Sequence, residues 1–448
     1  MKPLRMLVCG ISTVAFAATG SVTFSRDVAP ILQKNCQSCH RPGEAAPMSL
    51  LTYEQARPWA KAIKQAVLTK KMPPWFADPQ FGHFRNDRSL AQKDIDTLVN
   101  WVDAGAPQGD PNDLPTPVEF VDGWNIGKPD LVLEMPEPFP VPASGTIEYQ
   151  YVVLPYKFTD NRWVRMAEVR PGNRAVLHHV IAYIRDGSSK WMRDKKPGEI
   201  FVPEADAKGN RPSLKGDLLS GFAPGLPASI LEPGQGRLIK AGSDIVLQLH
   251  YTANGRSGED RTKVGMVFCK EPPEQRVMTL AASNNKFTIP PGDSNYQVDA
   301  DFEIAHDAKL SALLPHMHRR GKDFEYRLIY PTGETQTILR VPHYDFGWQL
   351  WYEPVSDILL PKGTKIACTA HYDNSPNNPN NPDPSKAVKW GDQSWEEMMI
   401  GFFDVTFPAD LDPKQLSPEK KKEPAVTTVA LHLKPGQPLL YFQTLSCS

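Results

Sequence analysis

The chain has 448 residues, which is enough for about three domains. Its 50 basic and 51 acidic side chains give a formal net charge of -1, so we expect no broad electrostatic attraction to nucleic acid. The 44 prolines are roughly twice the average share, which excludes long helical bundles and favours short strands joined by many turns.

Residues 1–18 have the pattern of a secretory signal peptide. Lys2 and Arg5 precede an apolar stretch over residues 6–18, which ends in small residues around Ala17. This stretch is too short to cross a bilayer, and no later segment has about 18 uninterrupted apolar residues. We therefore expect a periplasmic or secreted protein with no membrane span, whose remaining cysteines lie in an oxidising compartment.

Cys36-Gln37-Ser38-Cys39-His40 is a C-x-x-C-H run, the attachment motif of c-type haem. The two thiols form thioether bonds to the haem, and the adjacent imidazole is the proximal iron ligand. A zinc site needs a second ligand pair nearby, and a redox pair of cysteines has no need of His40. The sequence therefore predicts one covalent haem c held by Cys36, Cys39 and His40.

Two helices are predicted on either side of this motif. The first covers about residues 27–34 with Ser25 as its cap, and the second follows a capping box formed by Ser89 and Gln92. A helix before the haem cysteines and a helix at the end, packed together, resembles a class I cytochrome c. The resemblance covers about residues 22–108.

The sixth iron ligand is predicted to be Met72. Two prolines follow it, and they hold an extended loop that can present the sulfur to the iron, with Trp75 packed on the macrocycle. Met48 and His83 are the alternatives. Ligation by His40 and a methionine raises the reduction potential and blocks O2 at the iron, so we expect this haem to carry electrons.

Residues 109–143 are expected to be an extended, proline-rich linker. Beyond it, short β-branched and aromatic runs alternate with turn signals, and no helix-length pattern competes. We therefore predict a mainly β protein in which two jelly-roll-like β-sandwich domains, at 144–285 and 286–446, follow a small all-α cytochrome c domain. The best predicted strands cover residues 148–154, 163–169, 175–184, 244–251 and 324–330.

Histidines gather in three motifs of this region: His178-His179, then His250 in Gln-x-His-Tyr, then His316-x-His318. Side chains two residues apart on a strand share a face, so His316 and His318 can hold one metal ion. His178 and His179 diverge on a regular strand and can bind one ion only where the strand is irregular. Each motif alone is weak evidence, because a lone histidine in a strand is more often a core residue than a ligand.

The order of these motifs, followed by Glu396-Glu397-Met398, resembles the copper type II, ascorbate-dependent monooxygenases, the family of peptidylglycine α-hydroxylating monooxygenase and dopamine β-monooxygenase. The resemblance covers about residues 145–446. It implies one copper that takes up and passes on electrons, and a second copper that binds O2. The implied ligands are His178, His179 and His250 for the first copper, and the catalytic residues His316, His318 and Met398 for the second.

Several positions depart from the family pattern. The peptide enzyme has an arginine where this chain has Leu314, and polar and tyrosine residues where it has Ile400 and Phe402. We therefore expect no clamp for a substrate carboxylate, and an apolar substrate instead. Met399 stands where the family has a cysteine, and it is also the alternative thioether ligand to Met398. Disulfide pairing stays open among the cysteines outside the haem motif, Cys269, Cys368 and Cys447.

These features predict an exported copper-dependent monooxygenase that hydroxylates a C–H bond of an unknown small-molecule or peptide substrate with O2. An external donor, either a redox protein or an ascorbate-like reductant, supplies electrons through the fused haem. The expected cofactors are one haem c and two coppers, and the thioether of Met398 favours Cu(I), the state that meets O2. The alternatives are a non-catalytic haem and copper electron-transfer protein, and a copper oxidase or dehydrogenase that passes electrons to the haem.

Overall fold

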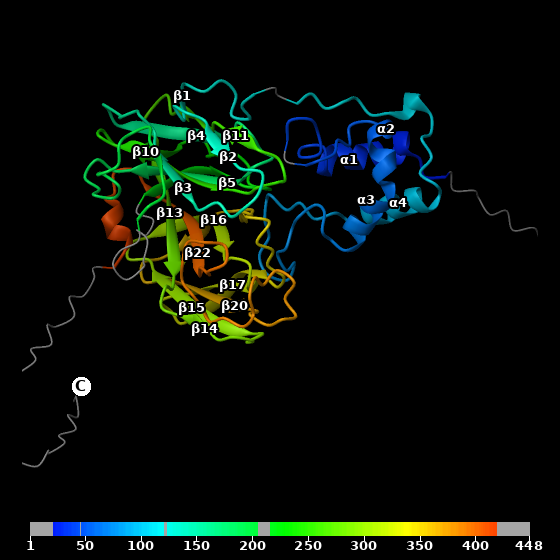
Figure 1. Ribbon diagram of the computed structural model, residues 1–448. Coiled ribbons are helices and arrows are strands. Elements are labelled where there is room, and N and C mark those ends of the chain that lie inside the picture. The colour runs from blue at the N-terminus through cyan, green and yellow to red at the C-terminus, as the bar shows by residue number, and fades with distance from the viewer. Residues whose placement is uncertain (1–20, 45, 121–122, 205–215, 419–448) are drawn as a thin grey trace, which may run out of the picture.

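A computed structural model describes residues 21–44, 46–120, 123–204 and 216–418. The predicted signal peptide and Cys447 lie outside these residues. A small helical N-terminal unit lies beside a larger body of β-sheets (Figure 1). Strand accounts for 34% of the chain and helix for 12%, which confirms the prediction of a mainly β protein with a small helical N-terminal region. Among the described residues, no helix combines the length and the apolar character needed to cross a membrane.

The helical unit is a set of short helices around one apolar core. Phe24 in the first helix contacts Trp101 in the last, with ring centroids 5.9 Å apart, and both side chains are buried. Lys64 and Asp103 join the last two helices at 2.5 Å. The helices are η1 (Phe24–Val28), α1 (Ala29–Asn35), α2 (Tyr53–Ala56), η2 (Arg57–Trp59), α3 (Ala60–Leu68) and α4 (Gln92–Asp103).

Both predicted helix caps are wrong. The first helix begins at Phe24, ahead of Ser25, because the carboxylate of Asp27 accepts a hydrogen bond from the backbone N–H of Thr23 at 2.8 Å. The hydroxyl of Ser25 is buried and has no partner. The start of α4 has no side-chain cap, so the predicted capping box at Ser89 is not formed either. In both places a helix is present close to the predicted residues, and only its start is misplaced.

The β body consists of two sandwiches that share one nine-stranded sheet, in the order β1-β12-β4-β9-β13-β22-β16-β19, with β8 beside β4. In the first sandwich this sheet faces the five-stranded sheet β6-β3-β10-β5-β7, and in the second it faces the four-stranded sheet β15-β20-β17-β18. The strands are β1 (Leu131–Glu134), β2 (Phe139–Val141), β3 (Gln150–Val153), β4 (Arg162–Arg170), β5 (Leu177–Arg185), β6 (Ile200–Phe201), β7 (Asp217–Phe222), β8 (Ser229–Ile230), β9 (Gln235–Ile239), β10 (Asp244–Tyr251), β11 (Gly258–Asp260), β12 (Lys263–Phe268), β13 (Gln275–Ser283), β14 (Thr288–Ile289), β15 (Tyr296–Glu303), β16 (Ala308–His316), β17 (Gly321–Ile329), β18 (Thr335–Val341), β19 (Ile358–Leu360), β20 (Lys365–Tyr372), β21 (Val388–Lys389) and β22 (Ile400–Pro408).

Two boundaries differ from the predicted ones. β1 and β2 lie inside the range 109–143 expected as linker, and they pair with β12 and β11, so the linker ends before Leu131. The predicted domain boundary at residue 285 puts β13 in the first sandwich. It pairs along its whole length with β22 but at only two positions with β9, so it belongs to the second half of the shared sheet.

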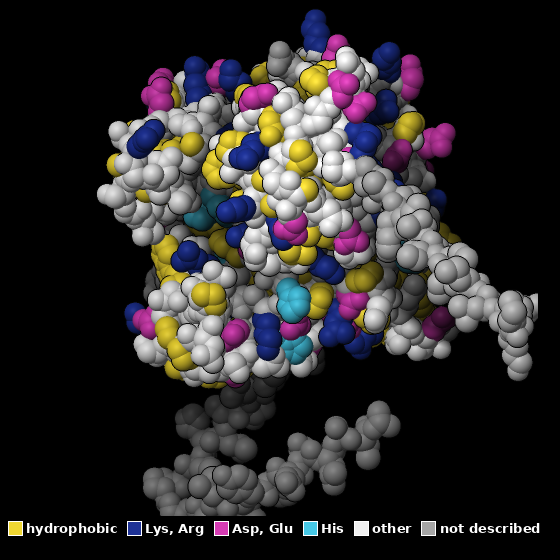
Figure 2. Space-filling model, turned by 90° about the vertical axis from the view of Figure 1, so that its right-hand side faces the viewer, with side chains coloured by type: hydrophobic (Ala, Val, Ile, Leu, Met, Phe, Trp, Pro, Cys, Tyr) yellow, Lys and Arg dark blue, Asp and Glu magenta, His cyan; other side chains and the backbone are white. Residues whose placement is uncertain are grey.

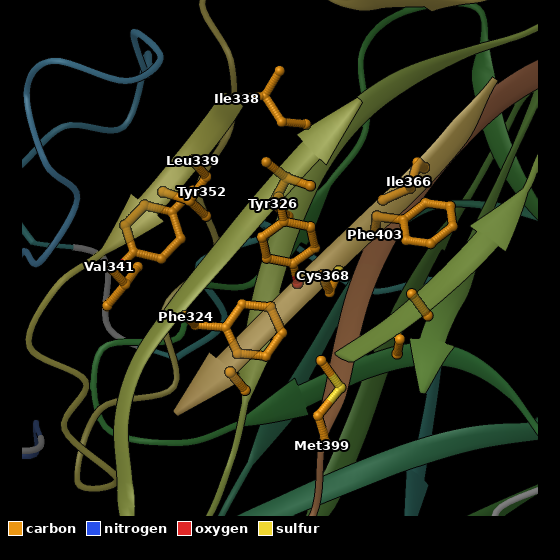
Figure 3. Close-up of a cluster of buried hydrophobic side chains, with 14 of the residues drawn as sticks. Phe324, Tyr326, Ile338, Leu339, Val341, Tyr352, Ile366, Cys368, Met399 and Phe403 are labelled. Atoms are coloured by element: carbon orange, nitrogen blue, oxygen red, sulfur yellow. The ribbon is translucent and has the colours of Figure 1, made fainter. Parts of the chain in front are cut away.

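Each sandwich has its own apolar core. Figure 3 shows part of the second core, where Phe324 and Tyr326 of β17 lie beside Cys368 of β20 and Phe403 of β22. The side chain of Met399 lies in the same cluster and is fully buried. The free thiol of Cys368 is therefore a core side chain.

The segment between α3 and α4 leaves the helical unit and packs on the second sandwich (Figure 1). We call residues 73–89 the strap. The backbone N–H of Asp78 donates to the carbonyl of Arg340 at 2.8 Å, and the ring of Trp75 lies 4.8 Å from that of Tyr352. Trp75 thus packs against the second core and also lines the cavity that contains Met72.

The surface shows no concentration of one charge on the face drawn in Figure 2, where basic and acidic side chains are interspersed. This pattern agrees with the formal net charge of -1.

Candidate metal centres

The first histidine set lies on the five-stranded sheet, and an irregularity in β5 brings its members together. His179 lies opposite His250 of β10, but the next paired residues are Leu177 and Tyr251. His178 is therefore an extra residue in β5, which forms a β-bulge. A bulge changes the direction of its side chain, so the adjacent histidines can face one point, as they cannot on a regular strand.

The nitrogens of these rings are spaced as metal ligands would be. One ligand nitrogen from each of His178, His179 and His250 lies within 4.8 Å of the others, and Nδ1 of His178 is 3.1 Å from Nδ1 of His179. Two nitrogens bound at about 2.0–2.1 Å to one tetrahedral ion lie roughly 3.3 Å apart. Nδ1 of His250 is buried without a hydrogen-bond partner, which leaves it free for such an ion.

Burial keeps these imidazoles in the neutral form that binds metal. It lowers the pKa of His179 well below the usual value, and the neighbouring histidines lower it further. Burial also lowers the pKa of His178. The pKa of His250 falls to about 3, mainly through burial and also through the nearby His178 and Arg319. The ring of Tyr149 stacks on His250 with centroids 4.6 Å apart and holds that ring in place.

The second pair, His316 and His318, lies at and just beyond the end of β16, with ring centroids 5.3 Å apart. Nδ1 of His316 is 3.0 Å from the side-chain oxygen of Gln349, and Nδ1 of His318 is 3.1 Å from the backbone carbonyl of Glu396. Each Nδ1 therefore carries the proton and donates it. The Nε2 atoms are left as the free, unprotonated ligand atoms.

Met398 and Met399 point to different environments. Met398 lines a cavity together with His316 and His318, while Met399 lies in the second core (Figure 3). The hydroxyl of Tyr372 donates to the carbonyl of Met398 at 2.7 Å and fixes this part of the backbone. Of the two methionines, Met398 is the one that shares a space with the histidine pair.

Glu397 joins the segment of Met398 to the end of β16. Its carboxylate is fully buried and accepts hydrogen bonds from the backbone N–H groups of His318, at 2.8 Å, and Arg320, at 2.7 Å. Burial raises the pKa of Glu397 to about 8, although these two N–H groups act in the opposite direction. Glu397 precedes Met398 in the chain, so these hydrogen bonds hold the backbone of His318 close to the segment that contains Met398.

One cavity of about 500 Å³ between the two sandwiches is lined by His179 of the first set and by both His316 and His318. The ring of Phe346 separates them: its centroid is 5.5 Å from that of His178 and 5.7 Å from that of His318. The residues of the sequence-based site prediction that line this cavity are His179, His316, His318, Met398, Leu314, Ile400 and Phe402.

The C-x-x-C-H motif follows α1. Cys36 and Cys39 are free thiols, and burial raises the pKa of Cys36 to about 12. Nδ1 of His40 lies 3.3 Å from the carbonyl of Met48, which leaves Nε2 as the free ring nitrogen. Burial lowers the pKa of His40, which favours the neutral ligand form.

The candidate sixth ligands lie in different places. Met72 lines a separate cavity of about 350 Å³, together with Val67 of α3, Ile95 of α4 and residues of the strap. The C-x-x-C-H motif does not border that cavity. His83 lies on the strap, exposed to solvent, and its carbonyl accepts a hydrogen bond from the N–H of Val355.

No family model matches the chain, and no curated protein matches it. A solved structure of PNGF-II is 10% identical, covers 62% of this chain and 64% of its own, and has a TM-score of 0.28. The infectious bursal disease virus VP2 subviral particle is 9% identical, with 65% of this chain and 75% of that chain covered and a TM-score of 0.19. The chain thus spans less than two thirds of the PNGF-II structure. Likenesses at these scores carry no argument about fold or function.

Sequence reasoning missed several side chains that shape the two centres. Glu397 belongs to the Glu-Glu-Met run, but nothing in the run indicates that it bonds to the backbone near His318. Phe346 and Gln349 lie in the segment after β18, which has no motif. Tyr149 precedes β3 and is about 100 residues from its stacking partner His250, so only the fold reveals the contact.

Proposed function

We propose that this chain is an exported monooxygenase that hydroxylates a C–H bond of an apolar substrate with O2, using two coppers and one haem c. The observation that carries the proposal is the cavity that His179 of the first histidine set lines together with His316, His318 and Met398. When bound, these metal groups supply the one-electron and O2 chemistry that side chains cannot perform. The chain's own residues hold, orient and shield them.

His178, His179 and His250 would hold the first copper. The support is the bulge that turns adjacent histidines to one point, together with the 3.1 Å separation of two Nδ1 atoms. Tyr149 and Phe346 pack on these rings, so the imidazoles are restrained on two sides.

His316, His318 and Met398 would hold the second copper. Two imidazoles and a thioether form a donor set that suits Cu(I). Gln349 and the carbonyl of Glu396 accept the Nδ1 protons, which leaves both Nε2 atoms available as ligands.

We also propose that the helical unit is a class I cytochrome c and that the two sandwiches are jelly-roll-like copper domains. His40 would be the proximal ligand, and Cys36 and Cys39 would form the thioethers. The carbonyl of Met48 lies on the Nδ1 side of His40, away from the nitrogen that binds iron. Met72 stays the proposed sixth ligand, with Met48 and His83 as the alternatives.

The position of the helical unit supports electron delivery to the first copper. The carboxylate of Glu44, in the loop after the haem motif, is 3.2 Å from Arg41 and 2.5 Å from Arg174. Arg174 belongs to the turn that leads into β5, where His178 and His179 lie. All three charged side chains are largely buried, so the contact fixes the haem loop next to that strand.

Metal analysis and oxygen labelling test the proposal. We expect about two coppers and one haem per copper-loaded chain, and incorporation of one atom from labelled O2 into the product. A Met398→Ala variant should keep the first copper, lose most of the second and lose O2-coupled turnover, because the thioether is its third protein ligand.

The outcomes separate the alternatives. Turnover that reduces O2 without labelling a product would indicate an oxidase instead. Two bound coppers with no O2-coupled turnover would indicate an electron-transfer protein. Full copper binding and turnover in the Met398→Ala variant would contradict the ligand assignment.

A further inference from the structure

Three strands form the cavity wall beside the second histidine pair, and their registers align side chains in rows. Side chains alternate along β22: Phe403 and Val405 enter the second core, while Ile400, Phe402 and Asp404 line the cavity. Across β13, β22 and β16, the first row is Ser283, Ile400 and His316, the second is Ala281, Phe402 and Leu314, and the third is Thr279, Asp404 and Ala312.

The rows differ in chemistry. The first row ends at His316, and the second is entirely apolar. The third row holds the hydroxyl of Thr279 and the carboxylate of Asp404. Since a strand rises by about 3.3 Å per residue, Asp404 lies roughly 13 Å along β22 from Ile400.

The third row is also where a buried guanidinium reaches the cavity. Arg237 of β9 donates to Asp404 at 2.5 Å and to the hydroxyl of Thr279 at 3.1 Å, and this hydroxyl donates to the other carboxylate oxygen at 2.5 Å. All three side chains line the cavity, and Arg237 is only 3% exposed. The guanidinium and the carboxylate neutralise each other, so the row offers hydrogen bonds without a net charge.

The charges around the rest of the cavity disfavour an anion. Five carboxylates line the whole cavity against two guanidinium groups, with Asp404 and Arg237 of the third row included. A cation is attracted to these carboxylates, but in the third row it meets Arg237, and the apolar second row gives it no partner. The lining charges are Glu232, Glu353, Asp357, Asp392 and Asp404 against Arg85 and Arg237.

We infer that the substrate is a long, uncharged, amphipathic molecule. Its hydrogen-bonding group lies at Thr279 and Asp404, its apolar segment crosses the second row, and the carbon to be hydroxylated lies beside His316 and Met398. This inference rests on the proposed function and adds the polarity, the length and the orientation of the substrate. Within the three rows, the first polar side chains beyond His316 that line the cavity are those of the third row, because Leu314, Ile400 and Phe402 are apolar.

Binding of decan-1-ol, whose extended length is close to 13 Å, tests the inference in the full-length protein, reduced with ascorbate under anaerobic conditions. Decanoate and decylamine are the charged controls. We expect the alcohol to bind at least about tenfold more tightly than either ion, because an ion is costly to bury without a partner of opposite charge. Thr279→Val should weaken its binding about tenfold by removing one hydrogen bond.

Thr406→Val is the matched control, since its buried hydroxyl on the same sheet has no partner and does not line the cavity. It should leave alcohol affinity unchanged. In protein with labelled methionine methyl groups, the terminal methyl of the alcohol should show a nuclear Overhauser effect to Met398.

Equal or tighter binding of either ion overturns the inference, as does an unchanged affinity in Thr279→Val or a terminal methyl remote from Met398. Metal content measured on the same sample separates this result from the proposed function. Two bound coppers without preference for the alcohol overturn only the inference. If the protein retains no copper after copper loading but still binds the alcohol in the expected orientation, the inferred substrate shape is supported. The proposed copper-dependent function is then contradicted.

Discussion

At the residue scale, buried charges in this protein are placed where backbone groups or opposite charges meet them. Glu397 is held by two backbone N–H groups, and Asp404 by Arg237 and Thr279. Asp217 is less well compensated. It is buried in β7, and its nearest cation, Arg276, is 3.9 Å away.

Asp217→Asn should change how stability depends on pH. Burial raises the pKa of Asp217 to about 6 from the usual 3.8. Its carboxyl therefore binds a proton more tightly in the folded than in the unfolded state, and stability falls as pH rises from about 4 to 6. The variant lacks this loss, so its stability relative to wild type should rise by up to about 3 kcal/mol over that range.

Thermal unfolding at pH 4, 5, 6 and 7 measures the effect. Asp186→Asn is the matched control, because Asp186 is a half-exposed carboxylate whose pKa is lowered by hydrogen bonds to Ser188. A constant difference between wild type and Asp217→Asn at every pH would contradict the prediction.

At the scale of elements, the sequence predicted what depends on local periodicity. Alternation placed β10 at the residues where it lies, and the spacing of His316 and His318 placed both on one face. Local pattern cannot show that His178 is a bulge, because the bulge depends on the register between β5 and β10. From sequence alone, the adjacent pair is therefore weaker evidence for a metal site than His316 and His318.

The strap was missed for the same reason. Its contacts are with residues far along the chain, and neither the prolines nor Trp75 indicate which surface they meet. Three contacts hold the strap on the sandwiches. The backbone N–H of Asp78 donates to a carbonyl, and the ring of Trp75 packs against Tyr352. Arg85 forms ion pairs with Glu353 at 2.8 Å and Glu232 at 3.2 Å. The strap thus ties the helical unit to both sandwiches.

Trp75→Ala should loosen the strap and leave the β body folded. The indole of Trp75 packs against the ring of Tyr352. Truncation of a fully buried aromatic side chain typically lowers the free energy of unfolding by about 3–5 kcal/mol. The loss should be smaller here, because the indole is half-buried. Hydrogen exchange should accelerate at Asp78 and Arg85 and stay unchanged in β10. Trp59→Ala, at an exposed tryptophan of the helical unit, is the control. Unchanged exchange in the strap would show that its backbone bonds suffice.

At the scale of the molecule, the helical unit contacts the first sandwich through Glu44 and Arg174, and the second through the strap. Sequence predicted a mainly β chain with a small helical N-terminal region, but it gave no information on how these parts are docked. Ion pairs between distant residues, such as Glu44 and Arg174, leave no pattern in the local sequence. In the proposed function, this docking decides which histidine set lies nearer to the C-x-x-C-H motif.

Exchanging the charges tests that docking. Glu44→Arg should reduce the docked population about fivefold, because it removes a pair that contributes on the order of 1 kcal/mol and places a third cation beside Arg41 and Arg174. Electron transfer from photoreduced haem to copper should slow accordingly. The double variant Glu44→Arg with Arg174→Glu should restore most of the rate. Equal rates in wild type and both variants would show that the contact does not position the haem loop.

The shared sheet has a mechanical consequence. β9 and β13 pair across the junction of the sandwiches, and Arg237 on one side binds Asp404 on the other. The two halves are therefore joined by backbone pairing at two positions and by one buried ion pair, and this junction lies between the two histidine sets. We therefore expect the thickness of a substrate to decide whether it fits between the two halves.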